Sequence, residues 1–396
     1  MRGVTTLWLS VASRKVSARI GGCADVGGAV EATWGQVFAW RLRRGFVEAR
    51  DGGDAVAVAR RLAGVQAQVA SAAETAVAVR RGGVPGELVR ALDAGELLKT
   101  WAMRGTLHAM TPDTTAAALA LIASARTWEK PAWQRNFGAD PGEVKALTDA
   151  VAELLDGGAV LSRTELVDEL VRDRRFAAMG EQLRSGWGAL LKPLAWQGVL
   201  CHGPARGSSV TFTAPAHAVS GWSGLPPTDI AASRLIHAYL GAYGPGTPEA
   251  FNAWLIRGVL RKTTVRQWFA DLGSELTEVD VEGRRTWIRT EDAAGLAATT
   301  PTDSVRLLGP FDQYVLGPGT TDPVLLPPAH RTKVSRTAGW ISPLVLVGGR
   351  IAGTWETIDN TLTVSMFDDE HVDSELLRAE AVHLARATGR DQLNLG

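Results

Sequence analysis

The sequence predicts an α+β protein that is mostly helical, and two features of the chain lead to this fold class. Up to about residue 292, sets of short amphipathic helices are each followed by strands. From residue 293 the chain is instead rich in strands and closes with one helix. Small helices followed by a strand ribbon are typical of a winged-helix module. We therefore predict three tandem winged-helix modules and a small, barrel-like C-terminal β-domain.

The composition is that of a globular protein with more than one compact unit. The chain has 396 residues, of which 45% are hydrophobic. Lys plus Arg and Asp plus Glu both total 42, so any contact with nucleic acid must depend on local positive charge. Cys23 and Cys201 form neither a disulfide framework nor a metal motif, which favours a cytoplasmic protein. No apolar run approaches the ~18 residues of a membrane span.

Residues 1–32 are expected to form a weakly structured extension, because polar and basic residues interrupt their apolar segment. The first module, residues 33–112, begins with Thr33 as a helix N-cap. Ser71 and Glu74 have the spacing of a capping box at the start of a later helix. The stretch "MRGTLHAMTP" alternates and predicts a short strand.

The next two modules are predicted at residues 113–225 and 226–292. In the first of these, Ser162 and Glu165 form another capping box, and "GVLCHGPARGSSVTFT" predicts a wing hairpin with a Gly/Pro-rich turn. The module at residues 226–292 ends in the strands "LTEVDVEG" and "RRTWIRT". In the β-domain, residues 293–396, "VLVGGRIAG" carries a Gly-Gly hairpin turn, and the last helix is predicted near residues 374–387.

The stretch "RLAGVQAQVASAAE" places two carboxamides, Gln66 and Gln68, in an apolar run. In a helix they would lie about 200° apart and could not face one target. Gly64 is, however, a plausible helix stop, and Ser71 begins the next helix. The alternating "VQAQV" between them predicts an extended link, in which residues two apart point to the same side.

Two interpretations of this glutamine pair remain open. Carboxamides neither titrate nor attack, but they can hold a water or a polar edge with oriented donors and acceptors. They suit a reaction whose leaving group is already activated, such as the loss of a cationic N-alkylated purine. In the other interpretation, both glutamines only satisfy backbone groups in a tight link between helices.

Several stretches together resemble the AlkZ/YcaQ-type winged-helix DNA glycosylases. They are "VQAQ", "TWAMRGTLHAM", "AYGPGTPEAFNAWL", "LLGPFDQYVLG" and "AGWISPLVLVGGRIAGTWE". The resemblance runs from about Thr33 to near the C-terminus and implies three winged-helix units around a concave surface plus a β-domain. In that family a Gln-Φ-Gln or Gln-Φ-Asp motif is catalytic, where Φ is apolar. Gln66-Ala67-Gln68 matches the Gln-Φ-Gln form of AlkZ, which implies catalytic roles for both glutamines.

The resemblance also implies a substrate: bulky N7-alkylated purines in duplex DNA, including some interstrand crosslinks. We therefore expect a monofunctional DNA glycosylase that acts as a monomer, without a cofactor or a metal. The alternative is a winged-helix regulator that binds DNA without catalysis. Such a regulator normally pairs symmetric half-sites through a dimer, whereas three unlike modules in one chain favour a monomeric enzyme.

Further candidates come from "MRGTLH" and "FDQY". Arg104, Thr106 and His108 alternate and would share one strand face, where they would line the pocket or grip phosphates. Alternatively, Thr106 and His108 are hydrogen-bonded structural residues. Asp312 and Tyr314 are two apart in an expected strand, and Asp312 either orients a catalytic amide or caps a turn after Pro310.

Basic residues supply the remaining candidates. "AHRTKVSR" is predicted to be a basic strand or hairpin that enters a groove of DNA, although such charge runs also form solvated faces. Its members are His330, Arg331, Lys333 and Arg336. Arg206 in the predicted wing is a further candidate for a phosphate contact.

Overall fold

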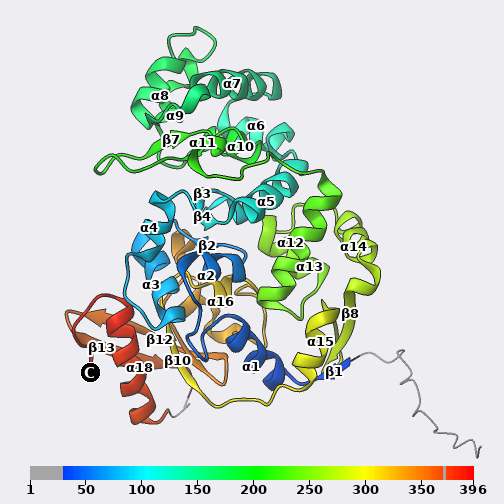
Figure 1. Ribbon diagram of the computed structural model, residues 1–396, viewed down its shortest axis with the longest axis vertical. Coiled ribbons are helices and arrows are strands. Elements are labelled where there is room, and N and C mark those ends of the chain that lie inside the picture. The colour runs from blue at the N-terminus through cyan, green and yellow to red at the C-terminus, as the bar shows by residue number, and fades with distance from the viewer. Residues whose placement is uncertain (1–29, 369–371) are drawn as a thin grey trace, which may run out of the picture.

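The computed structural model describes residues 30–368 and 372–396 and confirms the predicted α+β class (Figure 1). The second module lies at the top of Figure 1, the first module below it, and the C-terminal sheet at the lower left. The predictions for residues 1–29, which include Cys23, lie outside the described residues. None of the helices in the described part of the chain combines the length and the apolar character that a membrane span requires.

The first module combines three-stranded pairing with helices that cover one face of the strands. Its elements are α2 (Ala55–Arg61), β2 (Val65–Gln66), α3 (Ala70–Arg81), α4 (Glu87–Asp93), β3 (Leu98–Trp101) and β4 (Leu107–Met110). The strands pair in the order β2-β4-β3, and both pairs are antiparallel. The strand after the first helix therefore lies beside the second strand of the hairpin.

The second module repeats this strand order as β5-β7-β6. Its elements are α5 (Pro112–Ser124), α6 (Pro131–Phe137), α7 (Pro141–Leu154), β5 (Leu161–Ser162), α8 (Arg163–Leu170), α9 (Gly180–Arg184), α10 (Leu191–Trp196), β6 (Cys201–His202), β7 (Thr211–Thr213) and α11 (Pro215–Ala218). The predicted capping box of Ser162 and Glu165 and the wing hairpin are both confirmed. Because β3 pairs with β6, the two modules share one six-stranded sheet.

The third module repeats the order once more. Its elements are α12 (Thr228–Tyr243), α13 (Pro248–Ile256), α14 (Lys262–Asp271), β8 (Leu276–Val281) and β9 (Arg284–Arg289). Gly246 bridges to Trp287 of β9, and β9 pairs with β8. This repeated order supports the three-module interpretation, while the exact module boundaries stay a prediction.

The start of the described chain packs on the third module. Strand β1 (Val30–Ala32) pairs in parallel with β8, so the last residues of the expected extension belong to a sheet. Thr33 caps α1 (Trp34–Arg44) as predicted, through a bond to the backbone of Gln36. Helix α1 contacts both α12 and α15 (Thr290–Ala297).

The C-terminal unit is a five-stranded sheet in the order β10-β11-β12-β13-β14. Its elements are β10 (Val305–Leu308), α16 (Gln313–Leu316), α17 (Arg331–Val334), β11 (Leu344–Val347), β12 (Arg350–Ile358), β13 (Thr361–Met366), α18 (Ser374–Ala387) and β14 (Asn394–Leu395). The predicted hairpin turn is confirmed: Gly348 and Gly349 have φ of 55° and 83°, which the tight turn between β11 and β12 requires. The last helix also has the predicted bounds.

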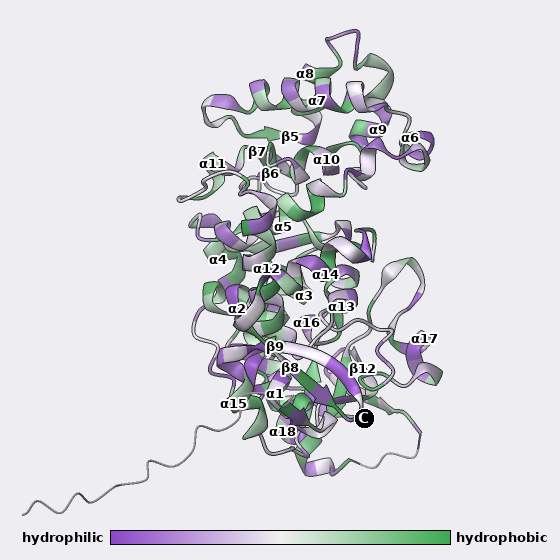
Figure 2. Ribbon diagram, turned by 90° about the vertical axis from the view of Figure 1, so that its right-hand side faces the viewer, coloured by the Kyte–Doolittle hydropathy of each residue, from purple (hydrophilic) through white to green (hydrophobic). Residues whose placement is uncertain are grey.

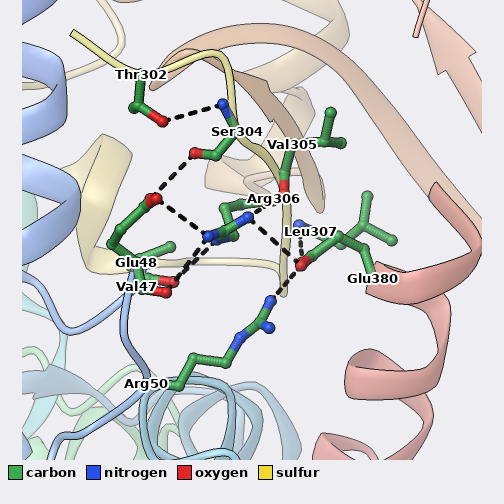
Figure 3. A network of polar contacts seen from close by, with 9 residues as sticks. All are labelled: Val47, Glu48, Arg50, Thr302, Ser304, Val305, Arg306, Leu307 and Glu380. Atoms are coloured by element: carbon green, nitrogen blue, oxygen red, sulfur yellow. Dashed lines mark hydrogen bonds and ion pairs between the residues drawn. The ribbon is translucent and has the colours of Figure 1, made fainter. Parts of the chain in front are cut away.

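An ionic network fastens this unit to the segment after α1 (Figure 3). The Arg306 guanidinium lies 3.3 Å from a Glu48 carboxylate oxygen and 3.7 Å from Glu380 of α18. Glu380 also pairs with Arg50 and accepts a hydrogen bond from the Leu307 backbone N–H at 3.1 Å. One strand, one helix and the N-terminal segment are thus linked through a shared set of charges.

A second ion pair, fully buried, joins the first module to the C-terminal unit. Arg80 of α3 donates two hydrogen bonds to Asp312, at 2.7 and 2.8 Å, and both side chains are completely buried. Burial opposes the charged form of Arg80, but the charge and hydrogen bonds of Asp312 outweigh this effect and raise its pKa. The Arg80 guanidinium therefore stays charged inside the protein.

We predict that Asp312→Ala lowers the free energy of unfolding by about 3–5 kcal/mol, because it leaves the Arg80 charge buried and unpaired. The measurement is urea unfolding followed by circular dichroism. The matched control is Asp149→Ala, which breaks the exposed pair between Asp149 and Lys145 and should change stability little. Equal effects of the two substitutions would contradict the structural role of the buried pair.

Candidate active site

The glutamine pair lies in an extended link between two helices, as predicted. Helix α2 ends at Arg61, and Gly64 adopts a φ of 116°. A Cβ at Gly64 would lie 2.6 Å from the Met110 side chain, so both the backbone conformation and the close approach require glycine. The chain therefore leaves the helix here and enters β2.

The start of the next helix differs from the prediction. Helix α3 begins at Ala70, and Ser71 and Glu74 form no capping box. The Glu74 carboxylate instead accepts hydrogen bonds from the backbone N–H groups of Gly86 and Val89, at 2.7 and 2.8 Å, and so caps α4. A partner twelve or more residues away cannot be read from local spacing.

Gln66 belongs to a row of polar side chains that crosses the sheet of the first module. It lies opposite His108 of β4, and His108 lies opposite Thr100 of β3. Their neighbours Val65, Ala67 and Ala109 pack in the module's own hydrophobic core. Because side chains alternate along strands, the polar row faces the other side of the sheet.

The three members of this row are buried. Gln66 is 6% exposed, and His108 and Thr100 are fully buried. Each has one buried side-chain atom without a hydrogen-bond partner among the described residues: Gln66 Oε1, His108 Nε2 and Thr100 Oγ1. Buried polar atoms are seldom left without a partner, so their concentration in one row marks a candidate functional feature.

Gln68 follows in a bend and is exposed. Its Oε1 accepts a hydrogen bond from the Leu107 backbone N–H at 3.3 Å, beside the bond from Ala67 N–H to the Leu107 carbonyl at 2.8 Å. The interpretation that the glutamines satisfy backbone groups thus holds for the oxygen of Gln68. It does not hold for the oxygen of Gln66, which has no hydrogen-bond partner among the described residues.

His108 is a neutral imidazole. Its Nδ1 lies 3.0 Å from the Thr106 carbonyl oxygen and therefore carries the proton and donates. Burial is the main reason that the pKa of His108 falls to about 3, the charge of Arg104 adds to the effect, and the bond to Thr106 opposes it. Nε2 is consequently a hydrogen-bond acceptor.

The prediction that Arg104, Thr106 and His108 share one strand face is wrong. Arg104 occupies a 3₁₀ turn, Met103–Gly105, with a φ of 57°, and β4 begins only at Leu107. The hairpin must turn within these few residues, which interrupts the alternation. Thr106 Oγ1 donates to the Met103 carbonyl at 3.1 Å, so this side chain stabilises its own turn.

Arg104 is directed toward two other elements. Its Nη1 donates to the carbonyl oxygens of Trp254 in α13 and Leu316 in α16, at 3.0 and 3.3 Å. Burial lowers the pKa of Arg104 to about 10, and the charge of Arg257 adds to this, while Tyr243 opposes it. The half-buried side chain of Arg104 therefore joins three parts of the chain.

The strand predicted for Asp312 and Tyr314 is a helix. Asp312 is the N-cap of α16, accepting from the Tyr314 backbone N–H at 2.8 Å, while it also pairs with Arg80. Tyr314 donates its hydroxyl to the Gly349 carbonyl at 2.7 Å, and burial raises its pKa. Both residues act in packing, which matches the turn-capping interpretation of Asp312.

The basic strand predicted around residue 330 is also wrong. His330 ends a 3₁₀ turn that Pro328 opens, and Arg331 and Lys333 lie in α17, because proline at the first position favours a helical start. His330 is buried, stacks on Phe367 and lies 3.0 Å from the Asp368 carboxylate. Arg331, Lys333 and Arg336 are exposed, and Figure 2 shows α17 at the edge of the molecule.

Arg206 lies in the wing of the second module, as predicted, but it has protein partners. It pairs with Glu165 at 3.2 Å and donates to the Val160 carbonyl at 2.7 Å. A phosphate contact by this side chain would compete with both interactions.

A pocket of about 740 Å³, here called the arginine pocket, was not predicted from the sequence. Its lining arginines are Arg44, Arg60, Arg61, Arg234 and Arg289. Asp113, Glu291 and Asp292 also line it; Asp292 pairs with Arg44 and Arg289, and Glu291 pairs with Arg289. Burial lowers the pKa of Arg61, and the neighbouring charge of Arg289 adds to this effect. These arginines come from α1, α2, α12 and β9, so their convergence cannot be predicted from local sequence.

A metal ion would need a group of side chains able to hold it. No three His, Cys, Asp or Glu side chains among residues 30–368 and 372–396 converge as a metal-binding group.

We predict that His108 makes the protein less stable in acid. Its pKa is about 3 when folded and about 6.5 when unfolded, so the unfolded chain binds the extra proton. Stability contributed by the neutral imidazole is present above pH 6.5 and is lost as the pH falls toward 3, by up to about 1.4 kcal/mol per unit. Urea unfolding at pH 7 and pH 4.5 should show a smaller loss in His108→Leu than in the wild type; identical losses would exclude a buried, neutral His108.

Comparison with known proteins places the chain in a family. The model of the family described as "DNA glycosylase AlkZ-like" matches residues 59–388. The "Interstrand DNA cross-link repair glycosylase" of Streptomyces sahachiroi is 52% identical over 367 residues, which cover 92% of this chain and 99% of that protein. The solved structure of the Streptomyces sahachiroi DNA glycosylase AlkZ matches with a TM-score of 0.90 and 51% identity, covering 93% of this chain and 100% of that one. The chain therefore belongs to the AlkZ-like DNA glycosylase family and is a DNA glycosylase, an enzyme that hydrolyses N-glycosidic bonds.

Proposed function

We propose that this glycosylase excises bulky N7-alkylated purines from duplex DNA and unhooks interstrand crosslinks, with Gln66 and Gln68 as its catalytic residues. The relative from Streptomyces sahachiroi is named for cross-link repair. The observation that carries the proposal is the broken helix at Gly64, which brings both carboxamides into one extended link beside β4.

The chemistry of such a lesion suits uncharged side chains. Alkylation at N7 gives the purine a positive charge, and cleavage of the C1′–N9 bond returns an electron pair to the ring and neutralises it. The base can leave without a strong general acid. A water adds to C1′ and releases its proton to solvent, which gives a free alkylpurine and an abasic site.

The two carboxamides supply polar contacts at this centre. Because Gln68 Oε1 is held by the Leu107 N–H, its exposed NH₂ group is free to donate. A donor of this kind can hold the attacking water through one lone pair or bind an acceptor on the departing purine. Neither amide can form a Schiff base, so we expect a monofunctional enzyme that leaves the strand intact.

We predict that Gln66→Ala combined with Gln68→Ala lowers the rate of base release by about 100-fold or more, the usual cost of losing an oriented donor. The assay uses duplex DNA with one N7-alkylguanine, followed by hot alkali to reveal abasic sites. The matched control is Gln392→Ala, an exposed glutamine near the C-terminus. Equal release by the double variant and the wild type would contradict the catalytic assignment.

The arginine pocket is proposed to contact the DNA backbone beside this centre. Arg60 and Arg61 form the last turn of α2, which leads directly into the glutamine link. The partly buried arginines repel one another, and a phosphate would offset that repulsion. The pocket is therefore a better candidate for phosphate binding than Arg206, whose charge is already paired.

We predict that Arg60→Ala combined with Arg234→Ala weakens DNA binding and lowers the slope of log affinity against log salt by about one per lost phosphate contact. Fluorescence anisotropy with a labelled duplex at several salt concentrations measures both quantities. Arg378→Ala is the control, because Arg378 is an exposed residue of α18 paired with Glu375. An unchanged salt slope in the double variant would exclude the pocket as a backbone contact.

A further inference from the structure

We propose that Thr100 and His108 are positioning residues for Gln66, and that the three side chains hold one water molecule between them. This water would fix the Gln66 carboxamide with its oxygen toward the protein and its NH₂ group toward the substrate. The inference rests on the proposed catalytic role of Gln66.

The strand register places Gln66, His108 and Thr100 side by side across the sheet. Gln66 and Thr100 lie opposite His108 on its two sides, in β2 and β3. Directly opposite residues in antiparallel strands have Cβ atoms about 4.5–5.5 Å apart. The imidazole of His108 therefore lies between the other two side chains on one face of the sheet.

Each of these three side chains also has a buried polar atom without a hydrogen-bond partner among the described residues. Gln66 Oε1, His108 Nε2 and Thr100 Oγ1 are all buried, and none has a partner among the described residues. No hydrogen bond joins the three atoms to one another, and Gln66 Oε1 and His108 Nε2 are both acceptors, so these two cannot satisfy each other. Buried waters typically make about three hydrogen bonds to polar groups of this kind.

One water molecule can satisfy the unpartnered atoms of all three side chains. His108 donates its only ring N–H to Thr106, which leaves Nε2 as an acceptor. Gln66 Oε1 is also an acceptor, whereas the Thr100 hydroxyl can donate. A water has two hydrogens and accepts readily, so it donates to the nitrogen and the amide oxygen and accepts from the hydroxyl.

Such a water would give both glutamine amides the same orientation. The water holds Gln66 Oε1 inward, as the Leu107 N–H holds Gln68 Oε1. Each amide then presents its NH₂ group on the substrate side. Two donors side by side match acceptors on the departing base and the lone pair of the attacking water, and a flipped Gln66 amide would lose this match.

The test compares substitutions that remove or keep the relevant atoms. Thr100→Val keeps the shape of the side chain without the hydroxyl, and His108→Leu removes the acceptor. Both should lower the single-turnover rate of base release about tenfold or more, while the KM for N7-alkylguanine duplex and the melting temperature stay close to the wild type. Thr100→Ser and His108→Gln, which restore a hydroxyl and an acceptor, should recover much of the rate.

A role confined to packing predicts the opposite pattern, in which melting temperature falls and rate follows stability without rescue. That pattern, or a full rate in Thr100→Val, would overturn the inference. The same substitutions made in Gln66→Ala should have no further effect on the rate, because residues that act through one another are not additive. If Gln66→Ala itself keeps the wild-type rate, the proposed catalytic role fails. If only Gln66→Ala loses the rate, the role stands and the water-held row is wrong.

Discussion

The pairing of β2 with β4 is the constraint on which the site depends. Gly64 ends the preceding helix because its φ of 116° and its contact with Met110 exclude a side chain. The chain then pairs with β4 for two residues and places Gln66 opposite His108. In a continuous helix the two carboxamides would diverge and could not share the catalytic role proposed for them.

The same strand separates the interior of the module from its polar face. Val65 and Ala67 pack in the hydrophobic core, so the chain is anchored on both sides of Gln66. The bond from Ala67 N–H to the Leu107 carbonyl adds a backbone restraint between the two glutamines. The catalytic role proposed for the glutamines would benefit from this restraint, because side chains that are held in place before the substrate arrives accelerate a reaction.

Local features of the fold could be predicted from the sequence, whereas long-range partners could not. The Gly-Gly hairpin, the capping box of Ser162 and the extended glutamine link each depend on a few adjacent residues, and each was confirmed. The strand predicted at Asp312 failed because Arg80, 232 residues away, holds that carboxylate at the start of a helix. The arginine pocket was missed for the same reason, since its members meet only after four elements pack together. The roles of Gln66 and Gln68 are still a prediction.

The distribution of charge around the link fits a cationic lesion. An N7-alkylated purine carries a positive charge until its glycosidic bond breaks, so a cation beside it would oppose binding. In the adjacent hairpin, His108 is neutral, and Nη1 of Arg104 donates to the carbonyls of Trp254 and Leu316. Five arginines meet instead in the arginine pocket, which is proposed to contact the DNA backbone. In the proposed function, the neutral amides would meet the cationic base and the arginine pocket would meet the anionic backbone, so the two opposite charges of one substrate would contact different parts of the protein.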